Sequence, residues 1–378
     1  MFDYVSLKFI WWLLVGVLLL GFAIMDGHDM GVGSLLPFVG KSDDERRAIL
    51  NSVGPHWEGN QVWFITAGGA IFAAWPLVYA AAFSGFYFAM LAVLWALFFR
   101  PVGFDYRSKV ADPRWRSAWD WGIFAGSAVP ALVFGVAIGN VIQGVPFHFE
   151  DSMMPVYTGS FWELFNPFAL VAGVVSLAML ICHGANYLIL RTEGDIQRRA
   201  GRASVVASVV MLAGFAIGGV FVAGMQGYLI TSPVDPGAVQ NPLDKVVVMQ
   251  AGAWLNNFKQ HPMLIALPAL GFIGGILSIV FALSKRGALA FVSSAVAELG
   301  IIFTAGIAIF PFVMPSSTDP KSSLTAWDCV SSQRTLEIMF WVALIMTPTI
   351  IAYTSWAYRV MRGKVTVEYI KANDRSAY

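Results

Sequence analysis

The chain has 378 residues, of which 57% are hydrophobic and only 12% are charged. Soluble domains carry about 25% charged residues, so a chain this apolar has too little polar surface to cover a water-soluble globule. The formal net charge of +1 gives no overall field that would attract nucleic acid. Composition therefore excludes a soluble enzyme and a nucleic-acid-binding protein, and it predicts an all-α integral membrane protein.

Apolar windows of about 20 residues, the length that crosses a bilayer, recur along the chain. The first has Asp3 before Lys8, which predicts an uncleaved span rather than a signal peptide. The second window begins with the polar segment HWEGNQ. If this window is not a span, the chain has eight spans instead of nine. We expect about nine transmembrane helices, at 9–26, 57–75, 78–99, 118–141, 164–190, 203–225, 262–283, 288–312 and 336–358.

The placement of lysine and arginine favours nine spans and sets their orientation. With nine spans, 19 of the 24 basic residues fall in loops on one side of the membrane. The other side holds only Lys8, Lys245, Lys259, Lys321 and Arg334. Because cytoplasmic loops are enriched in lysine and arginine, we expect the N-terminus outside and the C-terminus inside.

We expect a single membrane domain over residues 1–378, with an internal subdivision. DDERRA at 43–48 is similar to DIQRRA at 195–200, and this offset would superpose the first two helices on the fifth and sixth. Chance similarity of two short loops is the alternative. The predicted parts are a first four-helix group at 1–141, a second at 142–314 and a last helix with a cytoplasmic tail at 315–378. The outer connections at 142–163 and 226–261 are rich in Pro, Gly and Asn, which predicts turns and short interfacial pieces.

Polar residues gather at the inner ends of the first three predicted helices. Asp26 and Asp29, in MDGHDMGVG, are expected to close the first helix. Trp57 and Glu58 open the second helix, and Arg100 ends the third. Ionisable groups near hydrocarbon are costly unless they are paired or hydrated, so this cluster predicts a proton or ion path. The alternative is a set of interfacial acids at helix ends, with an arginine that reaches the lipid headgroups.

The histidines do not form a haem-ligand pattern. His28, His56 and His183 fall near inner helix ends, and His148 and His261 belong to outer segments. Haem held between helices needs ligands that face each other at matched depth, and no predicted helix carries two histidines. We therefore expect no haem and no metal ion ligated by this chain.

Three further residues are weaker candidates for the proton path, together with His28. Glu298 lies near the middle of the eighth predicted helix, where the alternative is a neutral acid that bonds to a neighbouring helix. His56 precedes the second helix, and Asp105 follows Arg100 in FFRPVGFDYR.

Several long segments carry a resemblance to a known family. They include FIWWLLVGVLLLGFAIMDGHDMGVG, NSVGPHWEGNQVWFITAGGAIFAAWPLVYAAAFSGFY, FFRPVGFDYRSK, RWRSAWDWGIFAGS and FTAGIAIFPFVMPSS followed by SLTAWDCVSSQRTL. These segments span nearly the whole chain, and the chain resembles subunit II of the cytochrome bd-type quinol oxidases. It departs from the family pattern at His28, where an aromatic residue is more usual, at Glu58, where Asp is also common, and at Glu298.

The resemblance implies a respiratory complex of the bacterial cytoplasmic (inner) membrane. Such an electrogenic quinol:O2 oxidoreductase takes electrons from ubiquinol or menaquinol and reduces oxygen to water with protons from the cytoplasm. Two haems b and one haem d would be ligated by subunit I, so no catalytic residue is expected in this chain. Further implied partners are a small single-span subunit, membrane lipid and quinone.

For individual residues, the resemblance implies a place in the proton path or near a haem for Glu58, Asp26, Asp29, Trp57 and Arg100. Two other functions remain as alternatives. A secondary transporter with an intramembrane carboxylate site would show paired helix breaks near mid-membrane. A purely structural subunit would make the carboxylate cluster dispensable.

Overall fold

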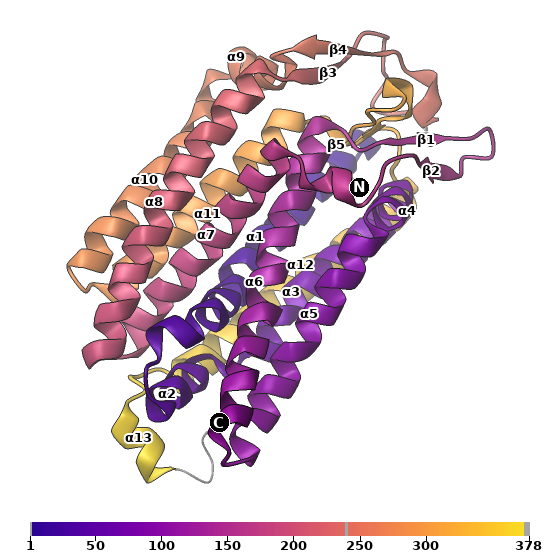
Figure 1. Cartoon of the computed structure of the whole chain (residues 1–378). Helices are drawn as coiled ribbons and strands as arrows, with labels where there is room; N and C mark the ends of the chain where they lie inside the picture. Colours follow the sequence, from indigo (N-terminus) through magenta and orange to yellow (C-terminus); the bar gives the residue numbers. More distant parts are fainter. Residues whose placement is uncertain (1, 239–240, 374–378) are drawn as a thin grey trace.

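Long helices packed side by side form the body of the molecule, with short strands at one end (Figure 1). The computed structural model describes residues 2–238 and 241–373. Its long helices are α1 (Tyr4–Val39), α3 (Trp57–Ala74), α5 (Tyr87–Tyr106), α6 (Pro113–Gln143), α7 (Pro167–Arg191), α8 (Gly194–Gly224), α10 (Ala266–Leu283), α11 (Gly287–Ile309) and α12 (Gln333–Val360). Within this part of the chain, eight helices are long and apolar enough to cross a membrane, or nine if α3 and the helix after it form one bent span. The helical membrane fold is confirmed.

The short elements divide between the two ends of the bundle (Figure 1). Three antiparallel strand pairs lie at the end that holds the N-terminus: β1 (Phe147–Phe149) with β2 (Pro155–Tyr157), β3 (Gln226–Ile230) with β4 (Val247–Ala251), and β5 (Phe312–Met314) with β6 (Leu324–Thr325). We call this the strand end. The opposite end carries α2 (Asp43–Val53) and α13 (Val367–Ala372), and we call it the basic end. The predicted outer connections thus contain β-hairpins, although residues 239–240 lie outside the described part.

The first helix is longer than predicted. We expected a span at 9–26 closed by Asp26 and Asp29, but α1 continues to Val39 and carries both acids in its interior. At Gly31 the continued helix packs tightly on α7, because a Cβ there would lie 2.0 Å from the carbonyl oxygen of Leu180. The two helices are therefore in close backbone contact at this level, as small residues permit, and other helices supply partners for the acids.

The third predicted span, 78–99, is wrong in its boundaries. The chain breaks at Trp75, and α4 (Pro76–Gly85) turns away from α3 by 120°. Pro76 lacks a backbone N–H and disfavours helical geometry in the residue before it, which fits the non-helical backbone of Trp75. The third span is α5 instead, so Arg100 lies inside the helix rather than at its end.

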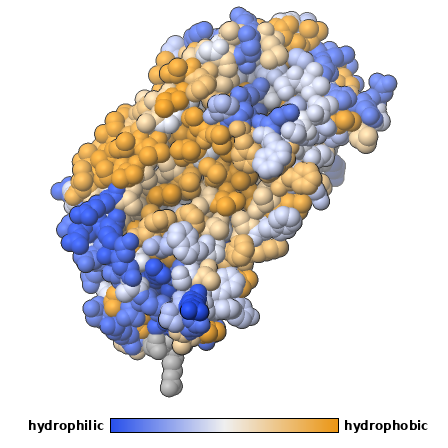
Figure 2. All heavy atoms as spheres, in the orientation of Figure 1, coloured by the Kyte–Doolittle hydropathy of each residue, from blue (hydrophilic) through white to orange (hydrophobic). Residues whose placement is uncertain are grey.

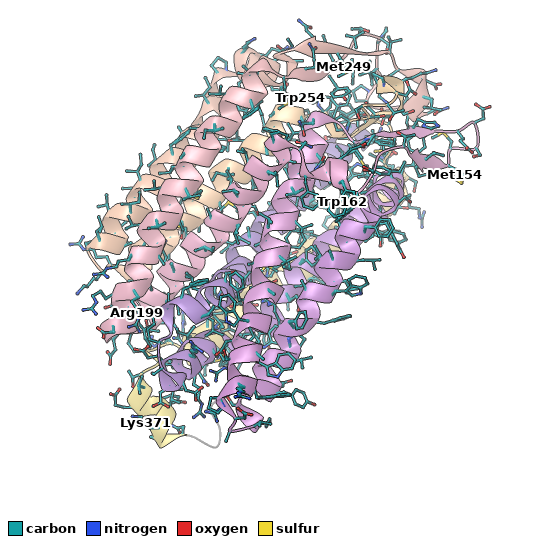
Figure 3. All side chains as sticks on the ribbon, viewed as in Figure 1. Met154, Trp162, Arg199, Met249, Trp254 and Lys371 are labelled. Atoms are coloured by element: carbon teal, nitrogen blue, oxygen red, sulfur yellow. The ribbon has the colours of Figure 1, made fainter. Side chains whose placement is uncertain are left out.

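The surface separates an apolar band from two more polar ends (Figure 2). Large apolar side chains are exposed along α8, α10 and α12, including Ile345 at 66% exposure. At the basic end, ion pairs fasten α2 and the tail: Arg199 bonds to Glu45 at 2.7 Å and Lys371 lies 3.5 Å from Asp44. Arg199 and Lys371 are seen there in Figure 3, opposite the strand end. An apolar band with charged ends is the pattern of a membrane-embedded bundle.

Candidate functional site

Asp26 on α1 and Arg100 on α5 form a buried ion pair. The guanidinium donates to both carboxylate oxygens, at 2.6 and 3.1 Å, and the two residues are 0% and 1% exposed. Trp57 lies over the guanidinium, 5.6 Å from ring centroid to Cζ, and stacks on Phe104 at 5.2 Å. A bidentate arginine pair of this kind is strong and geometrically fixed. Both charges are satisfied within the chain.

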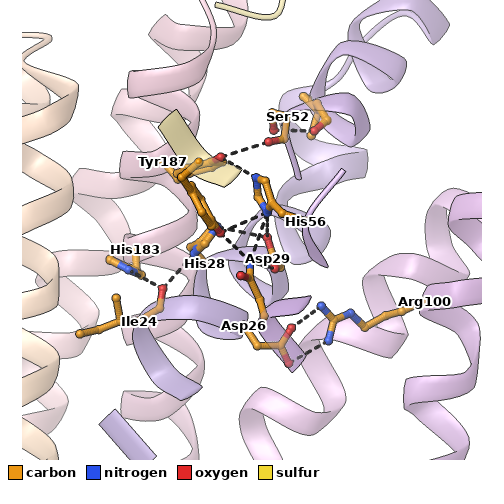
Figure 4. A network of polar contacts seen from close by, with 12 residues as sticks. Ile24, Asp26, His28, Asp29, Ser52, His56, Arg100, His183 and Tyr187 are labelled. Carbon is orange, nitrogen blue, oxygen red and sulfur yellow. Dashed lines mark hydrogen bonds and ion pairs between the residues drawn. The ribbon is translucent and has the colours of Figure 1, made fainter. Parts of the chain in front are cut away.

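Asp29, one turn further along α1, has a different environment. Its Oδ2 accepts a hydrogen bond of 2.7 Å from the side-chain amide of Asn60 on α3. Its Oδ1 is buried and has no hydrogen-bond partner among the described residues, although His28 Nε2 lies 3.2 Å away and His56 Nδ1 lies 3.9 Å away. Figure 4 shows Asp29 between these two rings, with the Asp26–Arg100 pair beside them.

The direction of the hydrogen bonds fixes what faces Asp29. His28 Nδ1 is 2.9 Å from the carbonyl oxygen of Ile24, which can only accept, so Nδ1 carries a hydrogen. In the neutral ring, Nε2 then presents a lone pair toward the unpartnered carboxylate oxygen of Asp29. Two acceptors at 3.2 Å form a hydrogen bond only if a proton lies between them. The His28–Asp29 contact is therefore a place that can hold an extra proton.

His56 connects this contact to a chain of hydroxyl groups. Its Nε2 is 2.8 Å from the hydroxyl of Tyr187, whose O–H donates to the carbonyl oxygen of Ser52 at 3.2 Å. The Tyr358 hydroxyl lies 3.2 Å from His56 Nδ1 and 3.4 Å from His28 Nε2. One continuous polar network inside the bundle thus contains Asp29, His28, Tyr358, His56 and Tyr187.

Three residues that contact this network were not among the residues predicted from the sequence. His183 on α7 donates through Nε2 to the carbonyl oxygen of Ile24 that His28 also uses, at 3.1 Å. Tyr187 and Tyr358 were not expected, because tyrosine near a helix end is common at membrane interfaces and gives no signal of its own.

The remaining predicted residues lie apart from the network. Glu58 and Asp105 are both exposed on the surface of this chain. Glu298 is fully buried on α11, and neither carboxyl oxygen has a hydrogen-bond partner among the described residues.

The histidine rings do not fit haem ligation in pairs. The centroids of His28 and His56 are 5.8 Å apart with planes tilted by 55°, and those of His28 and His183 are 6.0 Å apart. A porphyrin needs a wide, flat slot between its two ligands, but the ring of Tyr187 packs 4.3 Å from His28 and the ring of Tyr358 packs 4.4 Å from His56. The His183 nitrogens are also occupied, by Ser294 at 2.7 Å and by the Ile24 carbonyl.

Comparison with known proteins identifies close relatives over the full length. A family model described as cytochrome bd terminal oxidase subunit II matches residues 7–361. The chain is 57% identical to the cytochrome bd-I ubiquinol oxidase subunit 2 of Escherichia coli K12, with 100% of both chains covered. It is 33% identical to the cytochrome bd ubiquinol oxidase subunit 2 of Bacillus subtilis, over 96% of this chain and 97% of that one.

A solved structure shares the fold. The bd oxidase from Geobacillus thermodenitrificans superposes on 94% of this chain and 98% of its own with a TM-score of 0.64, at 13% sequence identity. The break at Trp75 and the long α1 therefore belong to a bundle whose overall arrangement has a counterpart in a known protein.

Proposed function

Because the chain belongs to the cytochrome bd terminal oxidase subunit II family, we propose that it serves in a complex that oxidises quinol and reduces O2 to water. Its relatives include cytochrome bd ubiquinol oxidase subunits of Escherichia coli and Bacillus subtilis, and it is a multi-pass protein of the bacterial inner membrane. Ubiquinol or menaquinol would be the electron donor.

In this proposal the two haems b and the haem d of the complex are ligated by subunit I. When bound there, they supply the electron transfer and the oxygen chemistry. The histidine rings of this chain, each packed against a tyrosine or phenylalanine ring, support this division. Helix α12 is long enough to cross a bilayer, and only 6% of its apolar window is buried within this chain. This exposure supports contact of α12 with a large partner subunit or with lipid. A small single-span subunit and quinone are further proposed partners.

We propose that the basic end faces the cytoplasm, with the N-terminus outside. Arg46, Arg107 and Arg116 at this end, together with Arg199 and Lys371, support the orientation through the positive-inside rule. The proton-holding network would then lie on the cytoplasmic side of the bundle. His28 is eleven residues before the end of α1 at Val39, which is about 16 Å at 1.5 Å per residue.

The network supports a proton path with distinct roles. Glu58, exposed on the first turn of α3, would collect protons from water. His56 and the Tyr358 hydroxyl would pass them to the His28–Asp29 contact through hydrogen-bond distances of 3.2 and 3.4 Å. The Asn60 amide orients the Asp29 carboxylate. Asp26 and Arg100 hold each other and fix the positions of α1 and α5.

The unpartnered oxygen of Asp29 carries this proposal, and Asp29→Asn tests it. The variant keeps the size of the side chain but removes the carboxylate that shares a proton with His28. In the purified complex we expect normal haem content and oxygen consumption reduced at least about tenfold, as loss of a proton-transfer group commonly produces. Asp151→Asn, in the exposed turn between β1 and β2, is the matched control. Wild-type oxygen consumption in Asp29→Asn would place the path elsewhere and favour a structural role for the cluster.

Glu58→Gln tests the collecting step separately. Because Glu58 is exposed and lies outside the buried network, its loss removes no member of the relay, and we expect a smaller decrease in oxygen consumption, with Glu58→Asp close to wild type. A Glu58→Gln complex that matches wild type from pH 6 to 9 would remove Glu58 from the path and leave Asp29 in it.

A further inference from the structure

Three lone pairs on three separate side chains converge on one point in the network. His28 Nε2 lies 3.2 Å from Asp29 Oδ1, and His56 Nδ1 lies 3.9 Å from the same oxygen. All three atoms are within 4.8 Å of one another, and all three residues are buried. We propose that these atoms form a binding site for a divalent transition-metal ion of the Zn²⁺ class.

Each proposed ligand is oriented by a hydrogen bond on its opposite side. His28 donates Nδ1–H to the Ile24 carbonyl, which leaves a lone pair on Nε2 for a metal ion. His56 bonds through Nε2 to the Tyr187 hydroxyl, and this hydroxyl gives its hydrogen to Ser52, so Nδ1 carries a lone pair. The Asn60 amide lies 3.2 Å from that lone pair, and a metal ion would take its place there. Metal-binding histidines commonly use their second nitrogen in this way, and it fixes both tautomer and ring orientation.

The carboxylate is arranged in the same manner. Asp29 Oδ2 accepts from Asn60, while Oδ1 is fully buried, unpartnered and directed at the two rings. An acceptor without a donor in a buried site is costly, and a cation would satisfy it. The Tyr358 hydroxyl lies 3.2 Å from His56 Nδ1 and 3.4 Å from His28 Nε2, so in this proposal it or a water molecule would supply the fourth ligand.

The chemistry of the three ligands selects the class of ion. Two imidazole nitrogens and one carboxylate oxygen suit Zn²⁺ and its neighbours, which take nitrogen and oxygen ligands at about 2.0–2.2 Å. Tetrahedral bonds of that length place ligand atoms roughly 3.3–3.5 Å apart. The His28–Asp29 distance of 3.2 Å already fits. His56 must move inward, both to shorten its 3.9 Å distance to Asp29 and to bring its Nδ1, now within 4.8 Å of His28 Nε2, to ligand spacing. Ca²⁺ and Mg²⁺, which prefer all-oxygen shells, are disfavoured.

Occupation of the site would block proton transfer. The ion would take the lone pairs that His28, His56 and Asp29 use in the proposed path, so Zn²⁺ would inhibit oxygen consumption from within this subunit. This consequence rests on the proposed function. The binding itself rests only on the geometry of the three side chains.

The test measures binding and activity separately in the intact purified complex. We would add Zn²⁺, remove unbound ion by gel filtration and measure bound zinc by elemental analysis, with X-ray absorption at the zinc edge to identify the ligands. We expect one additional zinc per complex, coordinated by two imidazoles and an oxygen. His56→Gln and His28→Gln should weaken binding at least tenfold, whereas His261→Gln, an exposed histidine near the strand end, should bind as wild type does.

The outcomes separate the two proposals. If zinc binds the wild-type complex but not His56→Gln, and inhibits oxygen consumption by the wild type, this result supports both the metal site and the proton path. Zinc that binds in the same way without slowing oxygen consumption supports the site and contradicts the proton path. Retention of zinc by both His→Gln variants, or an absorption spectrum without two imidazoles, overturns the site. If neither variant assembles, the absorption spectrum of the wild-type complex decides alone.

Discussion

Asp26 and Asp29 lie one turn apart on the same helix and are both fully buried, but they have opposite surroundings. Asp26 is held by two bonds from Arg100, and the aromatic face of Trp57 covers the arginine. Asp29 has one bond from Asn60 and an oxygen that faces two histidine nitrogens without a hydrogen between them. Both oxygens of the Asp26 carboxylate are occupied by Arg100. The Asp29 carboxylate has one oxygen without a hydrogen-bond partner, to which a proton or a cation could bind.

The difference shows that burial of an acid in a membrane protein does not by itself indicate proton transfer. A carboxylate with a full set of charged partners contributes to structure, since moving either partner leaves an uncompensated charge in a medium of low polarity. A carboxylate with an unfilled acceptor next to titratable rings can change its proton content. The predictions below test this contrast, from the largest expected effect to the smallest.

Asp26→Asn should destabilise the complex strongly. It leaves Arg100 buried without a counter-charge, which typically costs about 3–5 kcal/mol. We expect a lower thermal unfolding temperature and reduced haem content after purification. The double variant Asp26→Leu with Arg100→Met removes both charges and should recover most of the stability. If the double variant is no better than Asp26→Asn, the pair is not a closed structural unit.

Gly31→Ala should disturb the network around Asp29 more than it disturbs the Asp26–Arg100 ion pair. The added methyl would lie 2.0 Å from the Leu180 carbonyl oxygen, so α1 and α7 must separate at a cost of roughly 1–3 kcal/mol. Helix α7 carries His183 and Tyr187, whereas Arg100 lies on α5. We expect lower stability together with loss of zinc binding. Gly59→Ala, where the structure has open space within 4 Å of the added atom, is the control.

Asp29→Asn should change stability much less than Asp26→Asn does. The new amide can donate to a neighbouring histidine nitrogen, so no charge is left uncompensated, and we expect a loss of less than about 1–2 kcal/mol. Unfolding temperatures of the two purified variants, measured side by side, check this. Equal destabilisation would mean that Asp29 is as structural as Asp26.

Glu45 should give the smallest effect, through the pH dependence of α2 docking. Partial burial alone would raise the pKa of this carboxyl, but bonds from Arg199 and from the N–H groups of Lys41 and Ser42 lower the pKa below its usual value. A lowered pKa in the folded state stabilises the docked helix above the usual value of about 4.3. That stabilisation is lost as the pH falls through the folded-state pKa.

Hydrogen exchange of the α2 amides should therefore accelerate toward pH 4, and Glu45→Gln should remove this dependence. As for other partly exposed ion pairs, the effect should stay below about 1 kcal/mol. Since Ser52 lies on α2 and bonds to Tyr187, undocking would also disturb the His56 side of the network. An unchanged pH profile in Glu45→Gln would show that the other ion pairs hold α2 alone.

The sequence by itself determined that this is a helical membrane protein, because the length and spacing of apolar runs depend only on the thickness of a bilayer. It also predicted that Asp26, Asp29, Trp57 and Arg100 gather in one cluster, since polar groups in apolar helices stand out, but it placed Glu58 there too, and Glu58 is exposed. The split into two four-helix groups and the orientation in the membrane stay predictions.

Only the tertiary structure decided where α1 ends and which acid has which partner. Hydropathy treats Asp26 and Asp29 as equivalent and stops the helix at them, whereas α1 continues to Val39 and packs against α7 at Gly31. The partners of Asp29 come from α1, α3 and the segment before α3, with α7 and α12 beyond them, and no local pattern records contacts between residues so far apart in the chain. Tyr187 and Tyr358 became visible for the same reason. A side chain's chemistry is set by the atoms that face it, and packing brings those atoms together from distant parts of the chain.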